Sequence, residues 1–312
     1  MTPEAENPHL KTILESWERR AQVRQHSLLP ASSFDLSRKD FLPEWLPFFG
    51  HPTFERQRDR EAQILSVAWL QYNQVTIEIE NEIVIPLCLA LQLDLGREEP
   101  YRTLVVQAMV DEAYHVLLTN HATEMTRKFR QLEAIRLPKG HFVSAMQKRH
   151  ADCTSDWERN LVLLATGVIT EVFIGAYLGL IGSCKDERLQ PINIVATRAH
   201  MIDEAVHGVV FGALAERIVP RLGAEQKKFF WEVFPQVILW FFEGRTAAWN
   251  TLLPQVGFEN SAPMIAECRK QPTAILREEH WPVLEALAIR IGCPDFQQLL
   301  FQAARDRNGE VV

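Results

Sequence analysis

The strongest constraint on the fold of this chain is a five-residue pattern that occurs twice. Residues 111–115 read Asp-Glu-Ala-Tyr-His, and residues 203–207 read Asp-Glu-Ala-Val-His. In each copy the glutamate and the histidine are three residues apart, and on a helix this spacing places both side chains on one face. Each copy therefore predicts a helix that presents a Glu–His pair to a shared interior.

A further glutamate precedes each copy in an apolar stretch. Glu171 lies 33 residues before Glu204, and Glu80 lies 32 residues before Glu112. The repeated unit is therefore one glutamate followed by Glu-x-x-His. Four-helix bundles that hold two iron or manganese ions use this ligand set, with one Glu from each of two helices and Glu-x-x-His from the other two. The repeat and its helical geometry predict these ligands: Glu112, His115, Glu171, Glu204 and His207.

Residue spacing does not decide which glutamate begins the first unit. Glu78, Glu80 and Glu82 lie in the same apolar stretch, and Glu78 misses the 33-residue interval by as little as Glu80 does. Helical phase favours Glu80, because it shares a stripe with Tyr72 and Thr76. Glu78 and Glu82 lie on another stripe and stay open as alternatives.

A third histidine lies on the second repeat segment. His200 precedes Glu204 by four residues and His207 by seven, so the three side chains share one stripe of a helix. A histidine on a partly apolar face is more often a core residue than a ligand. Its place on this stripe nevertheless makes His200 a candidate for a seventh ligand.

The aspartate that begins each repeat is a candidate supporting residue. Asp111 and Asp203 point away from the neighbouring glutamates on a helix, where they could accept hydrogen bonds from ligand histidines and fix the histidine tautomers. The alternative interpretation is an ordinary surface or capping aspartate.

The residue types agree with this chemistry. Carboxylates can bridge two cations, and imidazole suits iron. Four carboxylates balance the charge of two ferrous ions. Without metal, four crowded carboxylates in an apolar core cannot all stay ionised, so we expect raised pKa values and proton release when metal binds.

Apolar residues recur at helical intervals along most of the chain, which predicts an all-α protein. We expect helices near residues 8–25, 54–92, 100–133, 157–183, 188–219, 224–250, 280–291 and 294–306. Pro86 should kink or locally widen the second of these helices without ending it.

The expected fold is a ferritin-like four-helix bundle with additional N- and C-terminal helices. A chain of 312 residues with 47% apolar residues can form one domain, so we predict a single helical domain over residues 1–312. Its expected parts are a metal-bearing bundle at about 54–219, a proline-containing strap at 26–53 and C-terminal helices at 224–306.

Residues 161–182 form an apolar segment that is long enough to span a bilayer. Glu171 lies near its middle, and an unpaired carboxylate at that depth of a membrane is costly. We therefore expect a central bundle helix and no membrane association. Gly167, Gly175 and Gly179 lie on the face of Glu171, either for close helix packing or to leave room for metals and substrate.

Net charge and cysteine content limit the partners and the cellular location that we expect for this protein. The formal net charge is −7, without a basic patch, so we expect no nucleic-acid partner. The five cysteines lie far apart and form no CxxC, and the N-terminus lacks the apolar core of a secretory signal. The sequence predicts a cytoplasmic protein.

The aromatic residues of 229–242 favour a core or homodimer contact over a pocket wall, and we expect a homodimer.

Several motifs together resemble the ferritin-like di-iron arylamine N-oxygenase family, the p-aminobenzoate N-oxygenase-like proteins. The resemblance covers roughly residues 45–215. The matching motifs are Pro47-Phe48, His51-Pro52-x-Phe54, Tyr72-Asn73 with Glu80 and Pro86, Val110-Asp111-Glu112-x-x-His115, Trp157-Glu158-Arg159 leading to Glu171, and His200-x-x-Asp203-Glu204-x-x-His207-Gly208. The resemblance selects Glu80 as the first glutamate ligand and His200 as the additional histidine ligand, so that all seven ligand positions are filled.

This resemblance implies an oxygen-dependent enzyme. The expected reaction oxidises a primary amine, either an aryl amine or an amino-acid-like one, to a hydroxylamine or nitro product through a peroxo-diferric intermediate. The expected cofactors are two iron ions (Fe²⁺/Fe³⁺), with manganese as a substitute metal and molecular oxygen as co-substrate. No Gly-rich nucleotide fingerprint occurs, so electrons should come from an external ferredoxin or reductase.

Substrate-contacting residues are less well defined. Tyr72 and Gly175 are candidates for the pocket or for support of the metals, and Arg277 is a candidate for holding a substrate carboxylate. A packed core tyrosine and an exposed arginine are the alternatives. On the same scaffold, a di-iron C–H hydroxylase or oxidase is the second candidate function, and an iron-binding or storage protein is the third.

Overall fold

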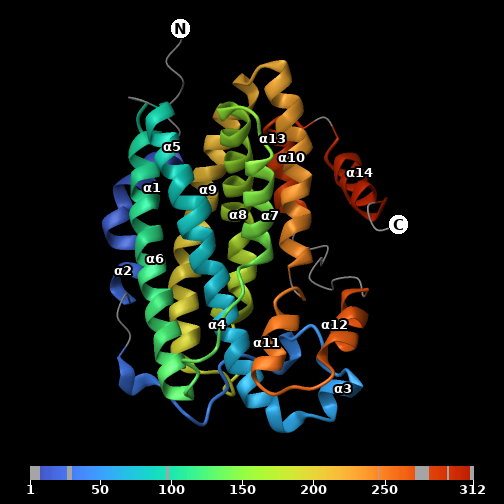
Figure 1. Ribbon diagram of the computed structural model, residues 1–312. Coiled ribbons are helices and arrows are strands. Elements are labelled where there is room, and N and C mark those ends of the chain that lie inside the picture. The colour runs from blue at the N-terminus through green and yellow to red at the C-terminus, as the bar shows by residue number, and fades with distance from the viewer. Residues whose placement is uncertain are drawn as a thin grey trace.

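The computed structural model describes residues 8–26, 30–95, 98–244, 246–270, 281–293 and 295–309. These residues form helices joined by turns, and none of them belongs to a strand (Figure 1). One isolated bridge joins Lys39 to Leu189. The predicted all-α fold is therefore confirmed.

Four long helical segments lie side by side as a bundle (Figure 1). They are α4 (Glu61–Ile79) continued by η4 (Glu80–Val84) and α5 (Ile85–Leu95), then α6 (Tyr101–Arg130), α8 (Asp156–Gly182) and α9 (Pro191–Ile218). Helix α6 packs on α4, α5 and α9, and α8 packs on α9. This arrangement brings both halves of the sequence repeat to one interior.

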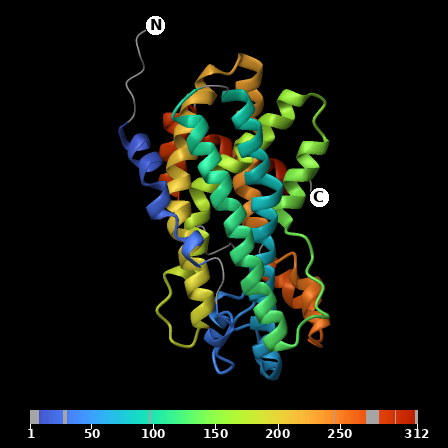
Figure 2. The same cartoon turned by 90° about the vertical axis from the view of Figure 1, so that its left-hand side faces the viewer.

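Shorter helices cover the bundle. The N-terminal helices lie along α6 and α9 on one side, as the turned view shows (Figure 2), and α7 and α10 pack on α8. The covering helices are α1 (Pro8–Arg20), α2 (Val23–His26), α3 (Pro52–Glu55), α7 (His141–Ala151), α10 (Ala224–Glu243), α11 (Trp249–Gln255), α12 (Ser261–Arg269), α13 (Trp281–Arg290) and α14 (Phe296–Gly309). Single 3₁₀ turns are η1 (Ala31–Ser33), η2 (Pro43–Trp45), η3 (Arg58–Arg60) and η5 (Val219–Arg221).

Helix α8 begins at a capping box, and its apolar residues are mostly buried. Ser155 and Glu158 form a capping box, in which each side chain accepts a hydrogen bond from the backbone N–H of the other residue. By length and composition α8 could cross a membrane, but 76% of its most apolar window is buried inside the protein. It packs against α5, α7, α9, α10 and α13, so its apolar character is accounted for by its central position.

The helix that carries Glu80 widens locally, as Pro86 predicts. Residues Glu80–Val84 form a π-helical turn, and the N–H of Ile85 donates to the carbonyl of Glu80, five residues earlier. Proline has no N–H, so it leaves a carbonyl in the preceding turn without its usual helical donor. The wider turn keeps the helix continuous and sets the direction in which Glu80 leaves it.

Several predicted boundaries were wrong. The helix expected at 8–25 is interrupted, because the N–H groups of Gln22 and Val23 donate to the side chain of Asp203 and leave the helical ladder. The helix expected at 224–250 ends at Glu243 and resumes at Trp249. Helices α7 and α12 were not predicted; both are short and gain most of their stability from packing on neighbours.

Helices α8 and α9 approach each other closely at a glycine beside the repeat. A Cβ atom on Gly208 would lie 2.9 Å from the carbonyl oxygen of Glu171, which belongs to the facing backbone. A Cβ atom on Gly175 would meet no heavy atom within 4 Å. The glycine after His207 thus allows the two ligand-bearing helices to touch, whereas Gly175 faces open space.

We predict that Gly208→Ala destabilises the protein by roughly 1–3 kcal/mol, because the new methyl group forces two backbones apart. Gly175→Ala is the matched control in α8 and should leave the melting temperature unchanged or slightly higher. Thermal unfolding of both variants, without metal, measures the difference. Equal melting temperatures would show that the close approach is not a constraint.

Candidate metal centre

The structure brings together all seven side chains that the sequence singles out as ligands. None of them is more than 2% exposed. Glu80 comes from the π turn, Glu171 comes from α8, and the remaining five come from the two repeat helices α6 and α9. Four segments that are distant in sequence therefore meet at one buried point.

The seven side chains form two overlapping groups. One contains Glu80, Glu112, His115, His200 and Glu204, and the other contains Glu112, Glu171, Glu204 and His207. Within each group the candidate ligand atoms all lie within 4.8 Å of one another. Glu112 and Glu204 belong to both groups, so their carboxylates are placed to bridge two metal ions.

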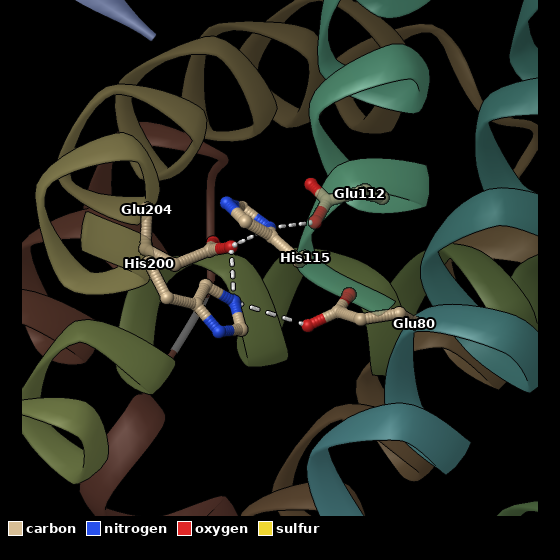
Figure 3. Close-up of side chains that lie close together, drawn as sticks. All are labelled: Glu80, Glu112, His115, His200 and Glu204. Atoms are coloured by element: carbon tan, nitrogen blue, oxygen red, sulfur yellow. Dashed lines mark hydrogen bonds and ion pairs between the residues drawn. The ribbon is translucent and has the colours of Figure 1, made fainter. Parts of the chain in front are cut away.

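The first group is shown in Figure 3. His115 Nδ1 lies 2.6 Å from Glu112 Oε2 and 3.1 Å from Glu204 Oε1. His200 Nε2 lies 3.0 Å from the same Glu204 oxygen and 3.3 Å from Glu80 Oε1. Two imidazole nitrogens and three carboxylates thus converge on one small volume.

The second group has one histidine. His207 Nδ1 lies 2.7 Å from Glu112 Oε1, 3.6 Å from Glu204 Oε1 and 3.7 Å from Glu171 Oε2. The two groups therefore differ, because His200 adds an imidazole to the first.

Unsatisfied polar atoms test whether metal fits here. Both carboxylate oxygens of Glu171, and Oε2 of Glu80 and of Glu204, are buried without a hydrogen-bond partner. His207 Nδ1 and Glu112 Oε1 lie 2.7 Å apart but do not have the geometry of a hydrogen bond. Burying a carboxylate without a partner costs several kcal/mol, so native proteins rarely leave one unsatisfied. Divalent cations would satisfy every one of these atoms, and the mixed carboxylate and imidazole set suits iron or manganese.

The pKa values of the cluster without metal also indicate that the site suits metal ions. Burial and the nearby charges of Glu112 and Glu204 raise the pKa of Glu80 to about 8, and burial beside Glu204 raises the pKa of Glu171 well above its ordinary value. Burial lowers the pKa of His207, but the carboxylates of Glu112 and Glu204 outweigh it and raise that pKa well above its usual range. Without metal the cluster therefore retains protons that metal binding would displace.

Two aspartates support the histidines, in a crossed arrangement. His207 Nε2 lies 3.4 Å from Asp111 Oδ2, and His115 Nε2 lies 3.7 Å from Asp203 Oδ2. Each aspartate thus faces the histidine of the other repeat. In both histidines Nε2 points to an aspartate while Nδ1 points into the cluster.

The alternative glutamates lie outside the cluster. Glu78 accepts hydrogen bonds from the N–H of Gly140 at 2.7 Å and from Gln74 at 2.8 Å. Glu82 pairs with Lys139 at 2.7 Å. The structure therefore places Glu80, and neither neighbour, among the candidate ligands.

A pocket of about 170 Å³ lies beside the bundle, and its mostly apolar walls include seven Phe, Trp or Tyr side chains. Its size is similar to that of a cavity that holds a benzene ring. Tyr72 lines it and stacks on Tyr177, with ring centroids 4.6 Å apart. Tyr72 also lines a second cavity of about 10 Å³, which reaches His200. Tyr72 therefore lies between this pocket, here called the outer pocket, and the small cavity at His200.

The structure adds residues that sequence reasoning missed. The aromatic walls include Trp45, Tyr177, Phe241 and Trp249, which come from four separate segments. Only Phe241 carried a signal, as part of the aromatic run in 229–242. Arg277, the candidate for a substrate carboxylate, lies outside the described residues.

Comparison with known proteins gives two findings. The sequence profile of the family described as p-aminobenzoate N-oxygenase AurF matches residues 3–292 of this chain. A curated protein of Streptomyces thioluteus, 4-aminobenzoate N-oxygenase, is 27% identical over 271 residues, which cover 83% of this chain and 79% of that protein.

We predict that the metal-free protein becomes less stable as the pH rises from about 6 to 8. Glu80 has a folded-state pKa of about 8, against an ordinary value of 4.5, so its stabilising proton is lost in this window. His115 and His207, whose pKa values are also raised, lose stabilising charge in the same direction. Thermal unfolding of metal-free protein across this range measures the effect.

Added Fe²⁺ should remove most of this pH dependence and should release protons in weakly buffered solution at pH 7. Stability that rises with pH in the metal-free protein, or metal binding without proton release, would contradict the prediction.

Proposed function

The chain belongs to the p-aminobenzoate N-oxygenase family and is an N-oxygenase, an oxidoreductase, and from this premise we propose that it oxidises the primary amine of an aromatic substrate at a two-iron centre. The observation that carries the proposal is the buried cluster of four glutamates and three histidines, in which several carboxylate oxygens have no hydrogen-bond partner. Molecular oxygen is the proposed oxidant.

The proposed ligands divide between two ions. Glu112 and Glu204 would bridge, while Glu80, His115 and His200 would hold one ion and Glu171 and His207 the other. The four carboxylates balance two ferrous ions, so the loaded site would carry no large net charge within the core. Iron bound in this way would supply the site for binding and reducing oxygen.

The outer pocket is the proposed binding site for the amine. Its aromatic side chains and size favour an arene, and Tyr72, stacked on Tyr177, lies between it and the small cavity at His200. Gln71 also lines this pocket, and its Oε1 is buried without a hydrogen-bond partner, so it can accept a hydrogen bond from the substrate. The buried ligands and the tyrosine pair keep bulk water from the reacting nitrogen.

The proposed reaction forms an N–O bond with one oxygen atom, while the other leaves as water. Two electrons and two protons must be supplied for each turn. We propose that a ferredoxin or a reductase supplies the electrons and that the first product is the hydroxylamine. Repeated turns would carry it to the nitroso and nitro compounds.

We predict about two irons per chain, and conversion of aryl amines to hydroxylamine or nitro products when the reduced protein receives oxygen. Metal analysis and mass spectrometry of products from a panel of anilines measure both. A panel should include 4-aminobenzoate, since a relative is named for that substrate. Oxidation at carbon alone, or hundreds of irons per assembly, would contradict the proposal.

A matched pair of variants tests the ligand assignment. Glu80→Gln should weaken iron binding by more than about 100-fold and abolish turnover, because it removes a proposed ligand charge. Glu82→Gln, two residues later, alters only contacts outside the cluster, with Lys139 and Gln147, and should retain iron and activity. Equal iron binding by both variants would remove Glu80 from the ligand set.

A further inference from the structure

The N-terminal segment of residues 17–24, here called the clasp, covers both aspartates that face the histidines. It comprises the last turn of α1, the break at residues 21 and 22, and the start of α2. Helix α2 packs against both repeat helices, α6 and α9. A segment at the beginning of the chain thus reaches the surroundings of the candidate metal centre.

Asp111 is held by side chains of the clasp. The indole N–H of Trp17 donates to it, with distances of 3.1 Å to Oδ1 and 3.0 Å to Oδ2. Arg20 Nη1 lies 4.0 Å from Oδ2, and Arg24 Nε lies 3.9 Å from Oδ1. The Arg24 guanidinium also covers the Trp17 ring at 4.1 Å. Asp111 itself is fully buried, so these groups replace water around its charge.

Asp203 is held by the backbone of the clasp. The N–H groups of Gln22 and Val23 donate to Oδ1 and Oδ2, each at 2.8 Å. Those two donors are available only because α1 ends before them. One short segment therefore fixes both carboxylates, which lie on different helices and belong to different repeats.

For His207 this arrangement selects the nitrogen that is presented to metal, because Asp111 lies within hydrogen-bond distance of Nε2. Asp203 faces Nε2 of His115 at 3.7 Å, beyond hydrogen-bond distance. A carboxylate that is fixed in place holds a proton on the Nε2 that faces it and leaves Nδ1 free to bind. His207 and His115 both direct Nδ1 at the shared glutamates. The described contacts of His200 are different, because its Nε2 faces the glutamates and no aspartate lies against it.

The two arginines of the clasp also change the net charge around the candidate metal centre. Two aspartates beside four glutamates would leave an excess of negative charge around two divalent ions. The guanidinium groups of Arg20 and Arg24 offset the aspartate charges without entering the cluster. Ordering the clasp thus favours a neutral, fully loaded site.

We propose that the clasp positions the histidines of the metal centre, with Trp17 acting through Asp111 on His207. The clasp thereby sets how tightly the ion at His207 and Glu171 is held. This inference rests on the proposed function for the identity of the ion. Trp17 touches no ligand atom in the described contacts, so it is a positioning residue.

Trp17→Phe is the test, because it removes the indole N–H and keeps an aromatic ring beneath Arg24. We expect the ion at His207 to bind about 10–100-fold more weakly, as loss of a supporting hydrogen bond does elsewhere. Chelator competition with Fe²⁺ should then show one tight iron in place of two, and Mössbauer spectra should change for one iron only. In turnover, kcat should fall while KM for the amine stays constant.

Trp157→Phe is the matched control, since Trp157 packs against Phe229 at 5.5 Å and has no described contact with either aspartate. It should bind two irons as the unmodified protein does. The metal-free melting temperatures of both variants show whether a general loss of stability explains any difference.

A double-mutant cycle tests the route through Asp111. If Trp17 acts through that carboxylate, Trp17→Phe should have little further effect on iron affinity in an Asp111→Asn background. Additive effects would overturn the proposed route, and unchanged iron affinity in Trp17→Phe would overturn the inference itself. An unmodified protein that binds no iron pair would instead contradict the proposed function.

Discussion

Repulsion among four glutamate carboxylates in a water-free interior is the constraint on which the rest of the structure depends. Each of them is almost fully buried, and several of their oxygens have no hydrogen-bond partner. Such a group is tolerable only with cations or retained protons to offset its charge. The long helices, the π turn at Glu80 and the contact at Gly208 all hold these charges close together, where the proposed metal ions would bind.

The ligand positions that could be predicted from the sequence are those that follow from local helical periodicity. Glu112 with His115, and Glu204 with His207, follow from the spacing within single helices, and the repeat supplies Glu171. Features that depend on contacts between helices were not predictable. The break at residue 22 is caused by Asp203, 181 residues later, and no local pattern contains that partner. The aromatic pocket likewise draws its walls from segments whose proximity only the folded chain creates.

The repeat also accounts for a difference between the two halves of the site. Both halves supply one lone glutamate and one Glu-x-x-His, but His200 occurs only in the second half and contributes to the first group of ligands. The small cavity beside Tyr72 reaches this same histidine. The side of the centre with the additional imidazole is therefore the side toward the proposed amine pocket, so the two ions would have different tasks in the proposed reaction.

The contacts of the clasp join segments that lie far apart in the sequence. Trp17 lies 94 residues before its partner Asp111, and Gln22 lies 181 residues before its partner Asp203. The contacts of the clasp can form only when α9 is in place, and closing so long a span of chain costs conformational entropy. The surroundings of the candidate metal centre are thus complete only when α2, α6 and α9 are packed together, so local order at these ligands depends on long-range closure of the chain.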